Sequence, residues 1–190
     1  MPTLFPPQVI RGPLGGLPLF KLQDSLKAGI LILMKPKLYM ETTIPSYLAS
    51  GPSRDLIVAG HQQITRLWWE NRKNQFDIFI SQFIIDEVSA GEQKQAKKRL
   101  EIIANCTQLE ITDEVTTLAQ ALLDDGIIPK KAATDAAHIA VAAVHGMDYL
   151  MTWNCTHIAN ATIFNSVKRV CIEQGFSFPI ICTPEELLGE

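Results

Sequence analysis

The sequence predicts an α/β protein, a three-layer α/β/α sandwich with a central, mostly parallel sheet. From Lys35 onward, short apolar segments with strand character alternate with segments that have helical spacing. This β-α repetition predicts a parallel sheet covered by helices on both faces. The chain has 190 residues, of which 47% are hydrophobic and 19% charged, and these values exclude a disordered chain and allow one substantial core.

The first predicted strand, Lys37-Leu-Tyr-Met, is apolar and ends at Glu41. Pro45 suits the first turn of a brief helix over 44–49, because that position needs no N–H donor. Leu56, Ala59 and Leu67 recur at helical spacing and predict a long helix over 55–74. The next expected elements are a strand over 76–81, a helix over 82–89 that stops at Gly91, and a helix over 93–104.

The second half of the chain continues the same alternation. Asp113 is expected to cap a helix that runs to about Asp125 and is closed by Gly126. Pro129 opens an Ala-rich helix that ends at Gly146. The remaining expected elements are strands over 109–111, 149–152 and 180–182, a helix over 160–174, and a short helix from 184.

Residues 1–33 differ from the rest of the chain, because they are rich in Pro, Gly and Leu without a clear period. The apolar run over 28–34 is too short to span a bilayer, and no small-residue cleavage site follows it before Lys35. We expect a tail or extension outside the fold over 1–33, and one domain over 34–190. An extra strand or an interaction arm is the alternative for 1–33.

The four cysteines contain no C-x-x-C pair, and a disulfide framework is not expected in a chain of this size. They are expected to be mostly buried thiols in a reducing cytoplasm, with no membrane partner. The net charge of -3 gives no global basic field for nucleic acid, although a local basic patch would serve.

Four polar residues fall where a predicted strand ends or near the start of a predicted helix: Glu41, Glu87, Asp135 and Asn154. Ligands of open parallel sheets bind beyond the carboxyl ends of the strands, so these side chains are expected to converge there. Carboxylate and amide oxygens suit Mg²⁺ or Mn²⁺ as ligands. A set of two or three carboxylates and one amide leaves coordination positions of the ion open for water and a phosphate oxygen. We therefore predict that all four are metal ligands and catalytic residues for an in-line displacement at phosphate.

The motifs around these four residues resemble those of the PIN domain, the nuclease-like fold of VapC-type toxins. They are, in order, Tyr39-Met-Glu-Thr-Thr43, Ile85-Asp-Glu-Val88, Asp135-Ala-Ala-His-Ile-Ala140 and Thr152-Trp-Asn154. The stretch Thr152-Trp-Asn-Cys-Thr-His-Ile-Ala-Asn160 is similar to a distinct PIN subgroup, and the resemblance spans Met34 to Glu190. It implies a metal-dependent ribonuclease, a homodimer and, for a toxin, an antitoxin protein as partner.

Two positions depart from the family pattern, since most members carry Asp where this chain has Glu41, and many carry Asp where it has Asn154. Asn154 and the acidic net charge favour a second function class, a PIN-like RNA- or protein-binding module with weak or lost catalysis. A haloacid-dehalogenase-type phosphatase is disfavoured because Glu41-Thr-Thr43 contains no second acid. The chain also lacks the glycine patterns of P-loop and dinucleotide sites.

Several residues near the predicted site have two interpretations. Thr43, Lys131 and His157 are predicted to contact substrate, Lys131 by guiding an RNA backbone without sequence readout. Thr43 could instead cap the following helix, and Asn154 could cap the turn that follows it. His138 is interpreted first as a packed histidine that holds a carbonyl or a neighbouring acid.

Overall fold

The computed structural model describes residues 34–189, and these contain a five-stranded parallel sheet. The strand order is β3-β2-β1-β4-β5, and every neighbouring pair is parallel. The strands are β1 (Lys37–Met40), β2 (Asp77–Ser81), β3 (Thr107–Leu109), β4 (Tyr149–Met151) and β5 (Ile180–Cys182). The prediction made for residues 1–33 lies outside the described residues.

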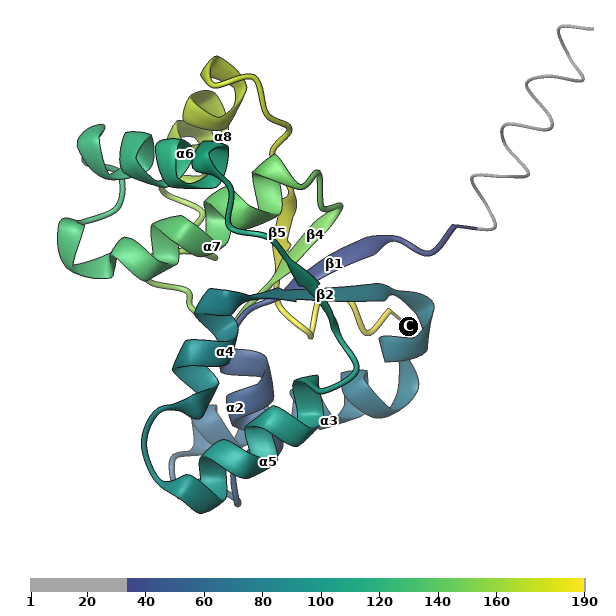
Figure 1. Cartoon of the computed structure of the whole chain (residues 1–190). Helices are drawn as coiled ribbons and strands as arrows, with labels where there is room; N and C mark the ends of the chain where they lie inside the picture. Colours follow the sequence, from purple (N-terminus) through teal and green to yellow (C-terminus); the bar gives the residue numbers. More distant parts are fainter. Residues whose placement is uncertain (1–33, 190) are drawn as a thin grey trace, which may run out of the picture. The chain divides into compact units, whose positions relative to one another are not determined.

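Helices cover both faces of this sheet, as the three-layer prediction requires. Figure 1 shows α2 to α5 on one side of the sheet and α6 to α8 on the other. Their bounds are α2 (Thr43–Ala49), α3 (Leu56–Asn71), α4 (Gln82–Ser89), α5 (Gln93–Ile103), α6 (Asp113–Asp124), α7 (Ala133–Val144) and α8 (Phe164–Glu173). None of the helices within residues 34–189 is both long and apolar enough to cross a membrane.

Several element boundaries differ from the predicted ones. The third strand lies two residues earlier, because Thr107 and Leu109 pair with Phe79 and Ser81 of β2. Short 3-10 turns take up the end of the predicted helix over 55–74 and the start of the one over 129–146. The helix predicted over 160–174 begins only at Phe164, and residues 184–188 form turns rather than a helix.

The cap of α6 was assigned to the wrong residue. Thr112, not Asp113, is the N-cap, and its hydroxyl accepts a hydrogen bond from Val115 N. Asp113 is the first residue of the helix, and an acidic side chain there interacts favourably with the positive end of the helix dipole. The glycines predicted to end α6 and α7 do so with left-handed backbone, φ being 73° at Gly126 and 60° at Gly146.

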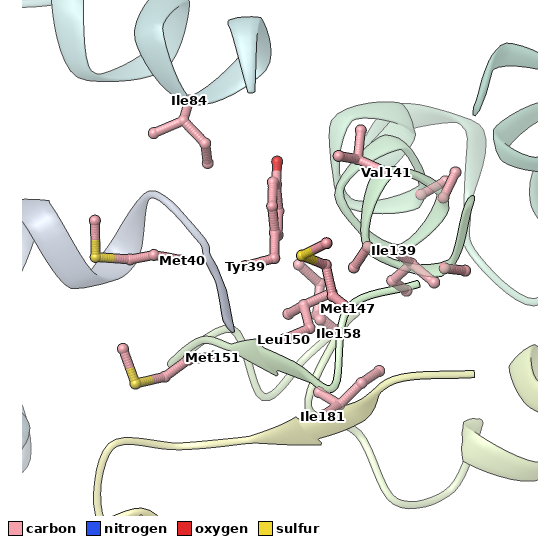
Figure 2. Packing of buried hydrophobic residues seen from close by; sticks show 14 of the residues in the cluster. Tyr39, Met40, Ile84, Ile139, Val141, Met147, Leu150, Met151, Ile158 and Ile181 are labelled. Carbon is pink, nitrogen blue, oxygen red and sulfur yellow. The ribbon is translucent and has the colours of Figure 1, made fainter. Parts of the chain in front are cut away.

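The core sits on both sides of β1, the middle strand. Leu38, Tyr39 and Met40 are all fully buried, as expected for a strand covered on both faces. Helix α7 is buried along nearly its whole length, from Ala136 to Ala143. Figure 2 shows Tyr39 standing off β1 between Ile84 of α4 and the α7 residues. The packing places a tyrosine hydroxyl inside an apolar layer, where it needs a hydrogen-bond partner.

Candidate functional site

The candidate site lies where β1 and β4 end side by side. After β1 the chain continues through α2 to β2, which pairs with β1 on the flank away from β4. After β4 the chain continues to β5, which pairs with β4 on the flank away from β1. Neighbouring strands whose connections diverge in this way leave a crevice at their carboxyl ends. Glu41 directly follows β1, and Thr152 directly follows β4.

Glu41 is held through a single carboxylate oxygen. Its Oε2 accepts hydrogen bonds from Thr43 N at 3.0 Å, Thr43 Oγ1 at 2.6 Å and Thr152 Oγ1 at 2.7 Å. The residue is only 5% exposed. Within residues 34–189 no hydrogen bond reaches Oε1, and no Lys or Arg pairs with this acid. Neutral donors therefore orient a buried carboxylate and leave its second oxygen free for a ligand.

Glu87, on the α4 helix, is held in the same way. Its Oε2 accepts from the Thr42 hydroxyl and from His138 Nε2, the latter at 3.1 Å. Partial burial raises the pKa of Glu87, but the hydrogen bonds from His138 and Thr42 outweigh it and hold the pKa below its ordinary value. The carboxylate is therefore ionised at neutral pH, and no hydrogen bond from the described chain reaches its Oε1.

His138 links Glu87 to the core of the protein. The histidine is 1% exposed, and its Nδ1 lies 2.9 Å from the Tyr39 hydroxyl, which lies 2.7 Å from Ser81 Oγ. An ionised carboxylate can only accept, so Nε2 must carry a hydrogen toward Glu87. Burial raises the pKa of Tyr39, which keeps the phenol neutral as a member of this chain. His138 thus holds a neighbouring acid, as its first interpretation stated.

One ligand atom each from Glu41, Glu87 and His138 lies within 4.8 Å of the other two. Both nitrogens of His138 are already hydrogen-bonded, so we assign it to positioning Glu87 rather than to binding an ion. The two carboxylates open into a hollow of about 370 Å³ that is also lined by Thr42, Thr43, Ser46, Tyr47 and Ala90. Two carboxyl groups in one hollow, each with an oxygen that no described donor reaches, suit a hard divalent cation.

The structure shows other surroundings for Asp135 and for the Asn154 side chain. Asp135 is half-buried in the first turn of α7, one turn before His138, and is not a member of the cluster of ligand atoms. The side-chain oxygen of Asn154 accepts from the backbone N–H groups of Thr156 and His157, at 3.3 and 3.1 Å. Asn154 therefore caps the turn after β4, which is the second of its two interpretations.

The three predicted substrate contacts occupy different places. Thr43 lines the hollow, and its hydroxyl donates to Glu41 while it accepts from Trp153 N at 2.9 Å. It is not a plain helix cap, since the cap position of α2 belongs to Thr42. Lys131 is exposed in the 3-10 turn η2 (Lys130–Ala132), and His157 is half-buried after β4. Neither of them is among the residues that line the hollow.

The sequence reasoning did not assign roles to three residues that shape the site: Tyr39, Thr42 and Thr152. Thr42 and Thr152 each follow a buried strand by one or two positions, and a hydroxyl there can face a carboxylate at the strand ends. That position was the available signal for both. Tyr39 gave no signal, because a tyrosine inside an apolar strand is ordinary and its bond to His138 joins positions 99 residues apart.

No family model and no curated protein matches this chain. Among solved structures, the chain is similar to VapBC2 from Rickettsia felis, solved bound to a DNA fragment from their promoter. The two are 17% identical with a TM-score of 0.45, over 77% of this chain and 98% of that one. The chemistry of the acidic hollow is therefore argued from this chain's own side chains.

Proposed function

We propose that this protein is a metal-dependent ribonuclease that hydrolyses phosphodiester bonds of RNA. The observation that carries the proposal is the arrangement of Glu41 and Glu87. Each carboxylate is fixed through Oε2 by two or three donors, and each keeps an unbonded Oε1 beside a common hollow.

Glu41 and Glu87 would hold the ion, Mg²⁺ or Mn²⁺. When bound, such an ion activates water and offsets the charge of a phosphate in an in-line displacement. Thr43 and Thr152 fix the direction of the Glu41 carboxylate, and His138 with Thr42 fixes that of Glu87. These donors are hydroxyls, a backbone N–H and one imidazole, and none of them is a Lys or Arg. They therefore orient the carboxylates and leave most of the negative charge that attracts a cation.

The motif order supports the same proposal, since the segments around Glu41, Glu87 and Asp135 resemble those of PIN domains. On this basis Asp135 and Asn154 stay in the proposal as further ligands, and Thr43, Lys131 and His157 as substrate contacts. RNA as substrate, an antitoxin protein as partner, a role as toxin of that pair and a homodimeric state are inferred from the resemblance. The proposed domain covers residues 34–190.

A second candidate is a PIN-like module that binds RNA or protein with weak or no catalysis. One observation favours it: the Asn154 amide oxygen is already hydrogen-bonded to two backbone N–H groups. With Asp135 outside the cluster, Glu41 and Glu87 would be the two acids at the hollow. Two carboxylates bind a divalent ion more weakly than three, which lowers activity at a given ion concentration.

The deciding experiment is cleavage of mixed RNA with Mg²⁺ or Mn²⁺ by wild type, Glu87→Gln, Asp135→Ala and Asp86→Asn. Asp86 is the matched control, because it is the exposed neighbour of Glu87 and bonds only to Gln82 within its own helix. We expect Glu87→Gln to lose at least about 100-fold in rate, as for removal of an electrostatic group at a reacting centre, and Asp86→Asn to match wild type. Loss in Asp135→Ala would add that acid to the site.

An inactive wild type that also binds no Mn²⁺ by calorimetry would reject the nuclease and favour the binding module. Equal rates for wild type and Glu87→Gln would reject the assigned site even if cleavage were observed.

A further inference from the structure

A column of three aromatic rings leads from beneath the site to the edge of the hollow. His61 of α3 stacks on Trp153 with ring centroids 3.9 Å apart and an interplanar angle of 13°. Tyr47 of α2 continues the column, with its ring centroid 6.2 Å from that of His61 at 30°. Trp153 is buried, whereas Tyr47 is partly exposed and lines the hollow together with Glu41 and Glu87.

Trp153, the buried end of this column, is hydrogen-bonded to the acidic site. Trp153 donates from its backbone N to Thr43 Oγ1 at 2.9 Å, and the same hydroxyl donates to Glu41 at 2.6 Å. The indole Nε1 of Trp153 donates to Thr65 Oγ1 of α3 at 2.8 Å. Both ends of the tryptophan are therefore fixed, and the distance between the rings and the carboxylates is set by the fold.

The charge of the hollow explains why an aromatic contact is needed there. Its lining contains two acids and no Lys, Arg or His. Without a bound cation, this surface repels the phosphates of a nucleic acid. Inside the hollow, affinity for RNA must then come from contacts other than those of basic side chains, and stacking of a base on an aromatic ring is such a contact.

We propose that Tyr47 stacks on a base next to the phosphate that is cleaved, and that this base is unpaired. The inference rests on the proposed function for the position of that phosphate. Burial is the largest cause that raises the pKa of the Tyr47 phenol, with Cys155 and Glu41 adding to it, so the ring stays neutral. A base inside a duplex has both faces covered by its neighbours and cannot occupy this place.

The test is binding of a fluorescent single-stranded oligoribonucleotide, followed by anisotropy with Ca²⁺ in place of Mg²⁺ or Mn²⁺, and a gel checks that the RNA stays intact. Tyr47→Leu keeps an apolar side chain and removes the ring, and we expect it to weaken binding by about 5- to 150-fold, the range of one lost stacking contact. Tyr47→Phe and Tyr47→Trp keep a ring and should bind within about threefold of wild type. A blunt-ended duplex of the same length, which has no unpaired base, should bind wild type at least about tenfold more weakly than the single strand.

Tyr149→Leu is the matched control. Tyr149 is also partly exposed and contacts one aromatic ring, that of Phe76, but it lies at the start of β4, away from the carboxyl ends of the strands. It should bind the single strand as wild type does. Melting temperatures of all variants show whether a loss reflects unfolding, and Tyr47→Phe serves as the folded comparison for Tyr47→Leu.

Three results would overturn the inference: undiminished binding by Tyr47→Leu, equal binding of the blunt-ended duplex and the single strand, or no binding of single-stranded RNA by wild type. The proposed function fails by a different result. Wild type that binds through Tyr47 but cleaves nothing would reject the nuclease and keep the stacking site. If Tyr47→Leu cleaves and binds RNA as wild type does, the stacking site is rejected and the nuclease is kept.

Discussion

At the scale of single residues, Oε2 of Glu41 accepts the hydrogen bonds that orient the carboxylate, and Oε1 is the oxygen proposed to bind the ion. Thr152 is the donor that best tests the role of Oε2. Its hydroxyl is fully buried and donates to Oε2 at 2.7 Å. Thr152→Val keeps the shape and removes the hydroxyl, which also accepts from Asn154 N at 2.8 Å, so we expect the free energy of unfolding to fall by about 1.5–3 kcal/mol. Thr152→Ser should stay close to wild type. Urea unfolding measures both, and equal losses in the two variants would point to packing instead.

Glu87 gives the protein a defined dependence of stability on pH. Its pKa is lower in the folded protein than in the unfolded chain, where it is about 4.3, so folding favours the ionised form. The stabilisation is complete above the unfolded value and is lost as the pH falls through the folded value. Between about pH 5 and pH 3, wild type should therefore lose more stability than Glu87→Gln, which does not titrate. Urea midpoints measured at successive pH values check this, and parallel curves would contradict it.

At the scale of elements, helix α3 begins with the best-defined cap among the described helices. Asp55 Oδ1 accepts from Ile57 N at 2.9 Å and from Val58 N at 3.0 Å. Asp55→Ala should lower the free energy of unfolding by about 1 kcal/mol, whereas Asp55→Asn, which keeps the accepting oxygen, should cost only a few tenths. Chemical denaturation of the three proteins measures the difference. A cost in Asp55→Asn as large as in Asp55→Ala would assign the effect to charge rather than to the cap.

The elements that the sequence predicted well are those whose signals are local. The strand from Lys37 and the helix from Gln82 have their expected bounds, because apolar patterning and a following glycine mark them. The strand near Leu109 was misplaced, since it is an edge strand with two exposed residues, and pairing with β2 fixes its position. That pairing is a long-range property, and hydrophobicity does not report it.

The site followed the same rule. Placing Glu41 and Glu87 at one edge of the sheet followed from parallel topology, and the hollow brings them together. The sequence could not tell that Thr42 and Thr152 orient these acids, because each bond joins residues at least 45 positions apart. For His138 it left open whether the ring holds a backbone carbonyl or a neighbouring acid, and the bond to Glu87 decides this. The role of the Asn154 side chain was open for a related reason: whether its oxygen faces a metal or the next turn depends on the backbone after β4.

At the scale of the whole molecule, a bound cation should stabilise the fold. An ion that binds only the folded state adds about 2.7 kcal/mol to its stability at 100 times the dissociation constant. Mn²⁺ should therefore raise the melting temperature of wild type. Glu41→Gln can keep an oxygen toward Thr43 and Thr152 and places –NH₂ where Oε1 was, so it should fold but show no Mn²⁺ effect. A Mn²⁺ shift of wild-type size in this variant would place the ion elsewhere.

The stack of His61 on Trp153 also makes the fluorescence of Trp153 a reporter of the site. The chain has three tryptophans, and Trp153 is the one whose backbone bonds to Thr43 at the hollow. Trp68 is fully buried in the core, and Trp69 lies under the Lys73 ammonium, 4.5 Å from its ring centroid. An occupant of the hollow that shifts the ring of Tyr47 or His61 changes the surroundings of the Trp153 indole. The difference in emission between wild type and Trp153→Phe would then follow occupancy of the site without any label.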